Sequence, residues 1–135
     1  MGEIIIMTSH YPDTNIPIVP MNPDIHPHKI LFSIWDREAM MAATTDQLII
    51  IGRDNDHEGV VVDLSSHHGR LLGVSRRHAV IFLTETGVGL RDLDSANGTS
   101  CNGTIVGSGM TYDLQDGDKI KLGGLSISLY FSDES

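Results

Sequence analysis

The sequence predicts an all-β domain in which two antiparallel sheets pack against each other as a β-sandwich. From Lys29 onward, short runs of apolar and β-branched residues alternate with Gly, Asn, Asp and Ser, which is the pattern of strands separated by turns. No helical periodicity in this region is long enough to indicate a helix. Short strands at regular spacing are typical of β-sandwiches, and 135 residues suffice for one such domain with its own core.

Residues 1–28 differ from the rest of the chain. All five prolines lie in this segment, and no lysine or arginine does. Proline fixes φ and lacks an N–H donor, so we expect an extended segment over 1–28 with little regular structure and a folded domain over 29–135. Within the segment, only Ile4–Met7 has the composition to dock as a short edge strand.

The expected strands are aliphatic or β-branched runs bounded by turn residues. A polar connection that includes Arg37–Asp46 joins the first two. Glu85–Gly87 has the length of a hairpin turn, and Asn102–Gly103 is the strongest hairpin signal in the chain. We expect strands over Lys29–Trp35, Leu48–Ile51, Val60–Leu64, Ala79–Thr84, Val88–Asp92, Ile120–Leu122 and Leu125–Phe131.

The charge of the chain excludes some classes of partner. A net charge of −9 argues against nucleic acid, because duplex binding needs an extended basic face. No apolar run approaches the ~20 residues of a membrane helix, and Ile4–Met7 lacks the basic flank of a signal peptide. We therefore expect a soluble, cytoplasmic protein with no membrane partner. Arg53, Arg70, Arg76 and Arg77 nevertheless fall within one short span, so a local cationic site fits within the acidic molecule.

One polar turn carries the chemistry that this cationic span can perform. Residues 73–79 read Gly-Val-Ser-Arg-Arg-His-Ala and run directly into an apolar strand. Two guanidinium groups beside the Ser75 hydroxyl offer charge-assisted donors that suit a phosphate. Taken by themselves, the residues also fit ordinary roles, because Arg53 can pair with Asp54 or Asp56 and Asn97-Gly98 can form a plain turn.

The order of several motifs resembles the forkhead-associated (FHA) domain, a module that binds phosphothreonine. The motifs are Gly52-Arg53, Ser75-x-x-His78, Asn97-Gly98-Thr99, Asn102-Gly103 and Gly117-Asp118-x-Ile120-x-Leu122-Gly123. The resemblance covers about Lys29 to Phe131 and implies the same two-sheet fold.

The resemblance also implies roles for individual residues. It implies that Arg53, Ser75 and Arg76 contact the phosphate and that Asn97 holds the ligand main chain. It implies that His78 is structural and bonds the loop that presents Ser75. Gly52, Gly98 and Thr99 would support the binding loops in the same way.

Two features depart from the family pattern. Ala96 stands where the family often has a polar residue, so one auxiliary contact is expected to be missing. The connection Ser65–Val74 is longer than in many FHA domains and contains His67, His68 and Arg70. We expect this loop to extend the recognition surface and to influence specificity.

Metal and redox sites are not expected. His67 and His68 have no third ligand at suitable spacing, and the acidic stretch Asp54–Gly59 resembles a calcium loop only until Ser65, where the bidentate Glu should stand. Cys101 is the only cysteine, which excludes an intrachain disulfide and a cysteine-rich zinc site. We expect no metal and no cofactor.

These observations predict a non-catalytic signalling module that binds a threonine-phosphorylated protein or peptide from a Ser/Thr kinase pathway. The alternative is a degenerate FHA-like domain with a structural or oligomerisation role and no phosphate binding. An enzyme is disfavoured because no triad, paired carboxylates or nucleotide loop can be identified. We also consider that a phosphorylated threonine of the N-terminal segment, Thr14 before Thr8, occupies the protein's own pocket or that of a neighbouring copy; an inert leader is the simpler expectation.

Overall fold

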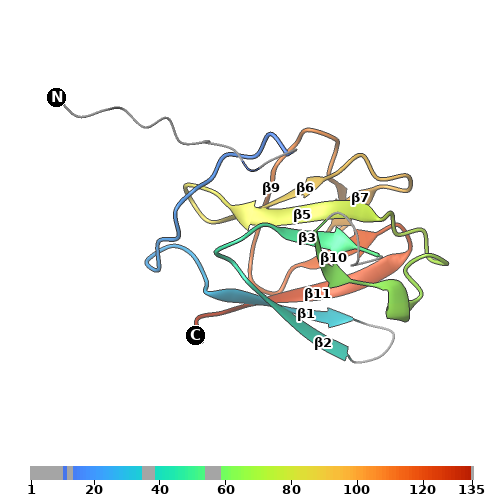
Figure 1. The fold of residues 1–135 in the computed structure, drawn as a ribbon, viewed down its shortest axis with the longest axis horizontal. Coiled ribbons are helices and arrows are strands. Elements are labelled where there is room, and N and C mark those ends of the chain that lie inside the picture. Colours follow the sequence, from blue (N-terminus) through green and yellow to red (C-terminus); the bar gives the residue numbers. More distant parts are fainter. Residues whose placement is uncertain (1–10, 12–13, 35–38, 54–58, 135) are drawn as a thin grey trace.

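The computed structural model describes residues 11, 14–34, 39–53 and 59–134, and these form two β-sheets packed face to face (Figure 1). The six-stranded sheet has the order β2-β1-β11-β10-β7-β8, and the five-stranded sheet has the order β4-β3-β5-β6-β9. The first sheet contains β1 (Lys29–Ile34), β2 (Ala39–Thr44), β7 (Thr99–Cys101), β8 (Thr104–Ile105), β10 (Lys119–Leu122) and β11 (Leu125–Ser132). The second contains β3 (Ile49–Gly52), β4 (Val60–Asp63), β5 (Arg77–Leu83), β6 (Val88–Asp92) and β9 (Tyr112–Leu114).

The main core lies between the sheets, and strand alternation explains which residues enter it. In β11, buried Leu125, Ile127 and Leu129 alternate with less buried residues, as a strand with one face on the core requires. In β1, Ile30, Phe32 and Ile34 are fully buried and occupy the same layer. The all-β prediction and its two-sheet architecture are therefore confirmed.

Most expected strands are present with bounds close to those predicted. The turn at Glu85–Gly87 joins β5 to β6, and Asn102-Gly103 joins β7 to β8, as predicted. The pairing between β3 and β4 is parallel, so the expectation of a purely antiparallel sandwich was wrong at this one pair. Trp35, at the end of the first expected strand, and the expected strand at Ile4–Met7 lie outside the described residues.

Two strands, β2 and β9, lie where neither a strand nor a hairpin was predicted. β2 lies inside the stretch Arg37–Asp46 that was expected to be a polar connection, and it pairs antiparallel with all of β1. Its sequence, Ala-Met-Met-Ala-Ala-Thr, carries little intrinsic strand preference, so the hydrogen-bonding edge of β1 determines its conformation. β9 spans three residues, which is too short for alternation to be recognised.

The described part of the N-terminal segment packs against the domain. Ile16 is fully buried against Ile50, Val80 and Phe82 on the outer face of the five-stranded sheet. At the other end of the segment, His26 Nε2 lies 2.7 Å from the Thr84 carbonyl oxygen. Through these two contacts, the described residues 14–28 of the segment pack on the surface of the domain.

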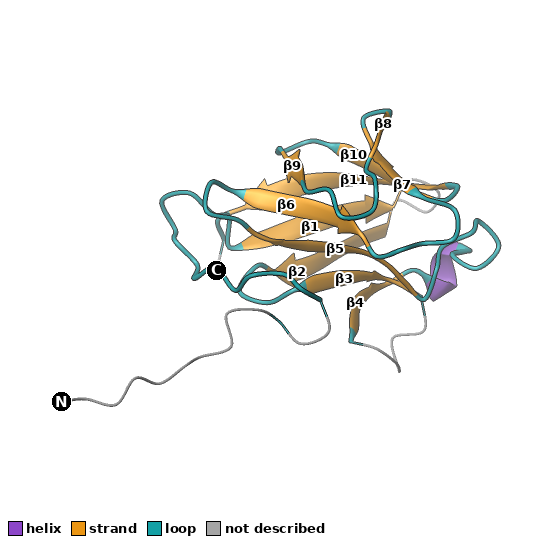
Figure 2. Ribbon diagram, turned by 90° about the horizontal axis from the view of Figure 1, so that it is seen from above, coloured by secondary structure: helices purple, strands orange, loops and turns teal. Residues whose placement is uncertain are grey.

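Among the described residues, one short helical element interrupts the strands. It is the 3-10 turn η1 (Ser65–His67) between β4 and β5, and Figure 2 shows it at the end of the sandwich where β3 also ends. Across the described ranges, no helix has the length and apolar character needed to cross a membrane.

Candidate functional site

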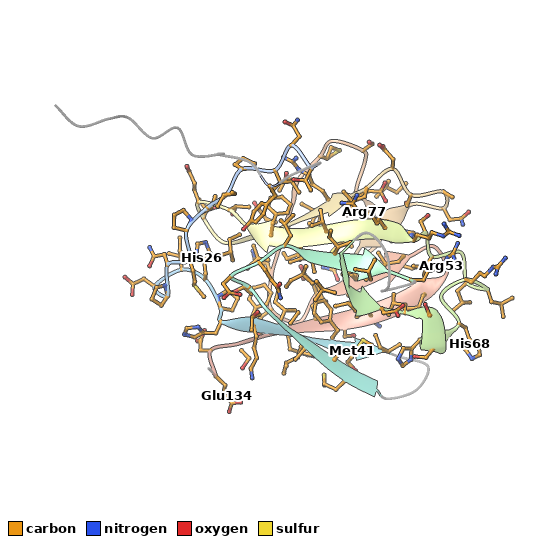
Figure 3. All side chains as sticks on the ribbon, in the orientation of Figure 1. His26, Met41, Arg53, His68, Arg77 and Glu134 are labelled. Carbon is orange, nitrogen blue, oxygen red and sulfur yellow. The ribbon has the colours of Figure 1, made fainter. Side chains whose placement is uncertain are left out.

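Three loops meet at one end of the sandwich. They are the end of β3 at Gly52-Arg53, the long connection from η1 to β5, and the loop between β6 and β7. Figure 3 shows Arg53 and His68 at this end and His26 at the opposite end. The predicted site residues belong to these loops, so the fold brings together segments that are distant in the sequence.

A cationic cavity of about 270 Å³ opens between the first two loops. It is lined by Arg53, Ser65, Arg70 and Arg76. Three of these described lining residues are arginines, one is a serine, and none is acidic. Guanidinium forks match the oxygen geometry of a phosphate and remain charged at any physiological pH.

The backbone of Arg53 is held directly against the turn that carries Arg76. The Arg53 amide donates to the Arg76 carbonyl oxygen (3.1 Å), and its Nε donates to the Val74 carbonyl oxygen (2.9 Å). Gly52 permits this approach, because a Cβ at that position would overlap the Arg76 carbonyl oxygen. The absence of a side chain at Gly52 therefore allows Arg53 and Arg76 to lie side by side.

His78 joins the Ser75 turn to the loop that carries Asn97. It is fully buried; the Ser75 amide donates to its Nδ1 (2.9 Å), and its Nε2 lies 2.9 Å from the Gly98 carbonyl oxygen. Because Nδ1 accepts, the ring carries its proton on Nε2 and donates it to Gly98. Burial lowers the pKa of His78, which favours the neutral ring that both hydrogen bonds require.

Ser75 and Asn97 lie beside this bridge. The Ala96 amide donates to Ser75 Oγ (3.0 Å), so the serine hydroxyl accepts here and its own hydrogen can point to another acceptor. The Asn97 side-chain amide donates to the Gly73 carbonyl oxygen (3.0 Å). Gly73 has φ +87°, and a Cβ there would lie 2.6 Å from Asn97 Nδ2, so the glycine is required for both its conformation and the close contact.

Asp92 organises the Asn97 loop, and the sequence analysis did not identify it. Its carboxylate accepts hydrogen bonds from the Ser95 amide, the Ser95 hydroxyl and the Thr99 hydroxyl. The Ser95 hydroxyl also accepts from the Gly98 amide (3.0 Å). The short spacing from Asp92 to Ser95 is the usual signal for such local side-chain capping, and it would have located this network.

The connection Ser65–Val74 contributes to the site in a different way from the one predicted. Arg70, expected in a specificity surface, lines the same cavity as Arg53, and Ser65 joins them although no role was assigned to it. His68 is exposed with φ 62°. His67 is only 8% exposed, so it lies beneath the surface to which it was assigned; its Nδ1 has no hydrogen-bond partner among the described residues.

Arg77 is not among the described residues that line this cavity. The register shift between β3 and β5 lies beside it, and Arg77 lines a different cavity together with Arg91. Arg76 and Arg77, although adjacent in the sequence, therefore line two separate cavities.

The described residues also bear on metal binding and on thiol chemistry. The part of the chain that the structure describes contains no group of three or more His, Cys, Asp or Glu residues placed to hold a metal. The acidic stretch Asp54–Gly59 lies almost wholly outside the described residues. Cys101 is buried, and burial raises the pKa of its thiol to about 11, which keeps it protonated and unreactive.

The sequence is similar to known proteins of one domain family. Residues 49–123 match the family model of the FHA domain. Over 83 residues the chain is 36% identical to the ABC transporter ATP-binding/permease protein Rv1747 of Mycobacterium tuberculosis, a match that covers 62% of this chain and 8% of that protein.

Two solved structures extend the similarity to the fold. One is an FHA domain studied for phosphothreonine-dependent interactions, with 30% identity, a TM-score of 0.61, and coverage of 76% of this chain and 96% of that one. The other is the FhaA FHA domain complexed with the intracellular domain of Rv3910, with 31% identity, a TM-score of 0.55, and coverage of 74% and 98% respectively.

Proposed function

This chain belongs to the FHA domain family, and on that premise we propose that it is a non-catalytic module that binds threonine-phosphorylated peptides. The observation that carries the proposal is the cavity lined by Arg53, Arg70 and Arg76, with the Ser75 hydroxyl and the Asn97 amide held on adjoining loops. A phosphothreonine carries about −1.5 to −2 charges at neutral pH. The cavity offers the cations and donors that such a group requires.

Each group has a proposed task. Arg53 and Arg76 bind the phosphate oxygens, and Ser75 donates its hydroxyl hydrogen to one of them. Arg70 adds a third charge from the long loop, so we assign it to phosphate binding as well as to specificity. Ser65 also lines the cavity, and its Oγ donates to Asp63 Oδ1 (2.6 Å); we assign Ser65 a secondary contact.

The peptide main chain is recognised by Asn97. Its amide carries both a donor and an acceptor, and these match the N–H and C=O of an extended peptide. Asn97 is exposed, so an approaching main chain can reach it. The bond from its amide to Gly73 fixes the side chain before the ligand arrives, which reduces the entropy lost on binding.

Residues flanking the phosphothreonine are read by the exposed part of the long loop. His68, Arg70 and Leu71 are exposed there, and Leu71 is 83% exposed. An apolar side chain beside a cationic cavity favours a ligand with an apolar residue near the phosphate. His67 is buried and has no part in this contact.

The partner is therefore a protein that a Ser/Thr kinase has phosphorylated on threonine. The net charge of −9 repels acidic ligands at long range, so the phosphate must be held by close contacts. We expect dissociation constants on the order of micromolar, or about −8 kcal/mol.

Isothermal titration with a phosphothreonine peptide library tests the proposal. The comparison uses the parent, Arg53→Ala, and Lys121→Ala as a matched control. Lys121 is exposed on β10 of the other sheet, so its replacement changes the charge equally without touching the site. Binding by the parent and by the Lys121 variant, with loss in the folded Arg53 variant, supports the proposal.

The same titration can favour the alternative. If no phosphopeptide binds the folded parent and unmodified peptides or a second copy bind instead, the domain is a degenerate structural or oligomerisation unit. Retained affinity in Arg53→Ala would contradict the assignment of the site.

A further inference from the structure

A second and larger cavity lies where the N-terminal segment meets the five-stranded sheet. Its volume is about 520 Å³, and none of its lining residues belongs to the cavity of Arg53. Arg77 of β5 and Arg91 of β6 form part of its wall, and Thr14 of the N-terminal segment forms another part. Two arginines and the Thr14 hydroxyl, which can be phosphorylated, therefore border the same space.

Arg91 is held in place before any ligand arrives. Its Cζ lies 5.4 Å from the centre of the Phe82 ring, and its Nε donates to Thr111 Oγ1 (2.8 Å). The cation–π contact and the hydrogen bond restrain the side chain, while the two Nη groups take no part in that bond. A fixed guanidinium loses little freedom when an anion binds.

Thr14 is held at the cavity wall by its own turn. Its hydroxyl donates to the Tyr11 carbonyl oxygen (2.9 Å), and the Ile16 amide donates to Thr14 Oγ1 (3.2 Å). Ile16, two residues later, is fully buried on the outer face of the sheet. This anchor keeps Thr14 beside Arg77 and Arg91 and on a different surface from Arg53.

The cavity is unsuited to strong binding of a free anion. Asp92 and Asp94 also line it, so two negative residues oppose the two arginines. Asp92 is occupied by Ser95 and Thr99, and Asp94 accepts from Ser108 (2.7 Å), but their charges remain. Only an anion tethered nearby, at an effective concentration of about millimolar, would fill such a site.

We propose that this cavity is a phosphate-monoester site whose occupant is phosphorylated Thr14 of the same chain. A Ser/Thr protein kinase would transfer the γ-phosphoryl group of ATP to Thr14 Oγ1, forming the P–O bond, breaking the O–H bond, and releasing ADP and a proton. The phosphate then pairs with Arg77 and Arg91 and fastens the N-terminal segment to the sheet. The hydroxyl bond to Tyr11 is lost, and the arginine contacts replace it. The proposal does not depend on ligand binding at Arg53.

The test uses the full chain with phosphothreonine at position 14, made by semisynthesis, beside the unmodified chain. Thermal melts give the effect of the phosphate on stability, and ³¹P NMR gives its second pKa. We expect Tm to rise by about 3 °C and the second pKa to fall below ~6, because adjacent cations favour the dianion. Inorganic phosphate, added to the unmodified chain at equal concentration, should reproduce neither effect.

Matched variants assign the effects to residues. Arg91→Gln and Arg77→Gln should each reduce both effects of the phosphate, Arg91→Lys should retain part of them, and Lys121→Gln should leave them intact. Each variant is compared with and without the phosphate, so its effect on basal stability cancels. Arg53→Ala should also leave them intact.

Several results would overturn the proposal. Loss of both effects in Arg53→Ala would place the phosphate in the first cavity, in the same chain or in a second copy. Absence of both effects, their survival in both Gln variants, or the same shifts from inorganic phosphate would exclude Thr14 as the occupant.

Discussion

The two arginine-bearing cavities differ in size and in the sign of their walls. The cavity at the loop end measures about 270 Å³ and is lined by Arg53, Arg70 and Arg76 without an acidic residue among its described lining. The cavity under the N-terminal segment measures about 520 Å³, but two aspartates offset its two arginines. Charge and preorganised donors, rather than volume, are therefore the reasons for proposing the loop-end cavity as the site for a ligand that arrives from solution.

The two cavities also differ in how their arginines are held. Arg53 is positioned by main-chain contacts with the Ser75 turn, whereas Arg91 is positioned by side chains, Phe82 and Thr111. Main-chain contacts depend on the close approach of two backbones. The first site should therefore be sensitive to changes in packing that leave the second untouched.

The largest expected effect follows from removing Arg53. Arg53→Ala should weaken phosphopeptide binding by about 2–5 kcal/mol, the usual loss when one partner of a desolvated charge pair is removed. Calorimetry on the variant measures it, with Arg91→Ala as the matched arginine from the second cavity. Equal losses in the two variants would contradict the distinction between the cavities.

The packing that positions Arg53 can be tested at Gly52. Gly52→Ala places a methyl group against the Arg76 carbonyl oxygen, so we expect a loss of stability of about 3 kcal/mol, at the upper end for overpacking, with weaker phosphopeptide binding. Gly87→Ala is the control, because a Cβ at Gly87 meets nothing within 4 Å. Urea unfolding compares them; a parental midpoint in Gly52→Ala would exclude the steric role.

Replacing His78 should act through loop order. His78→Ala leaves the Ser75 amide and the Gly98 carbonyl without their partner, at a cost of about 1–3 kcal/mol in unfolding free energy. Urea unfolding and amide NMR of both loops measure the effect. Weak binding combined with parental stability and unchanged loop signals would make His78 a ligand contact.

The threonine methyl group should contribute less to the binding free energy of the phosphopeptide than the phosphate does. The FHA family resemblance implies a small pocket beside Asn97 for the γ-methyl group, and one methyl group in such a pocket contributes about 1–3 kcal/mol. Matched peptides that carry phosphothreonine or phosphoserine supply the measurement. Equal affinities would show that the first cavity reads only the phosphate.

The smallest expected effect is on pH dependence. Burial holds the pKa of His78 below its ordinary value, so the unfolded chain binds a proton near pH ~6.5 that the folded chain resists. The stabilisation from His78 is complete above that pH and declines as pH falls. The difference in unfolding free energy between the parent and His78→Ala, measured by urea titration, should therefore become smaller from pH 7.5 to pH 5.5. A difference that stays constant over this range would contradict a lowered pKa of His78.

Local pattern predicted much of the fold, because most strands carry their own signal. The buried alternation of β11 and the hairpin at Asn102-Gly103 are visible in sequence. β2 was missed because its residues accept the conformation that the β1 edge imposes. The parallel pairing of β3 with β4 is likewise a property of chain topology, which short-range pattern does not contain.

Residues of the candidate site could be predicted where they belong to a sequence motif. They could not be predicted where only tertiary contacts bring them to the cavity. Arg53, Ser75, Arg76, His78 and Asn97 lie in family motifs, and the structure brings their loops together. Ser65 and His67 are the first and last residues of η1; Ser65 lines the cavity and His67 is buried, and no motif marks either position. The second cavity joins Thr14 to Arg91 across most of the chain, a relation that no local pattern encodes.

The buried state of Cys101 has a practical use for measuring these interactions. It is the only thiol in the chain, and its pKa of about 11 makes it a poor competitor for maleimide reagents at neutral pH. A cysteine introduced at Leu71, which is 83% exposed beside Arg70, would take a fluorophore selectively without removal of the native residue. Such a labelled domain would report phosphopeptide binding as a change in emission, as a reagentless sensor does.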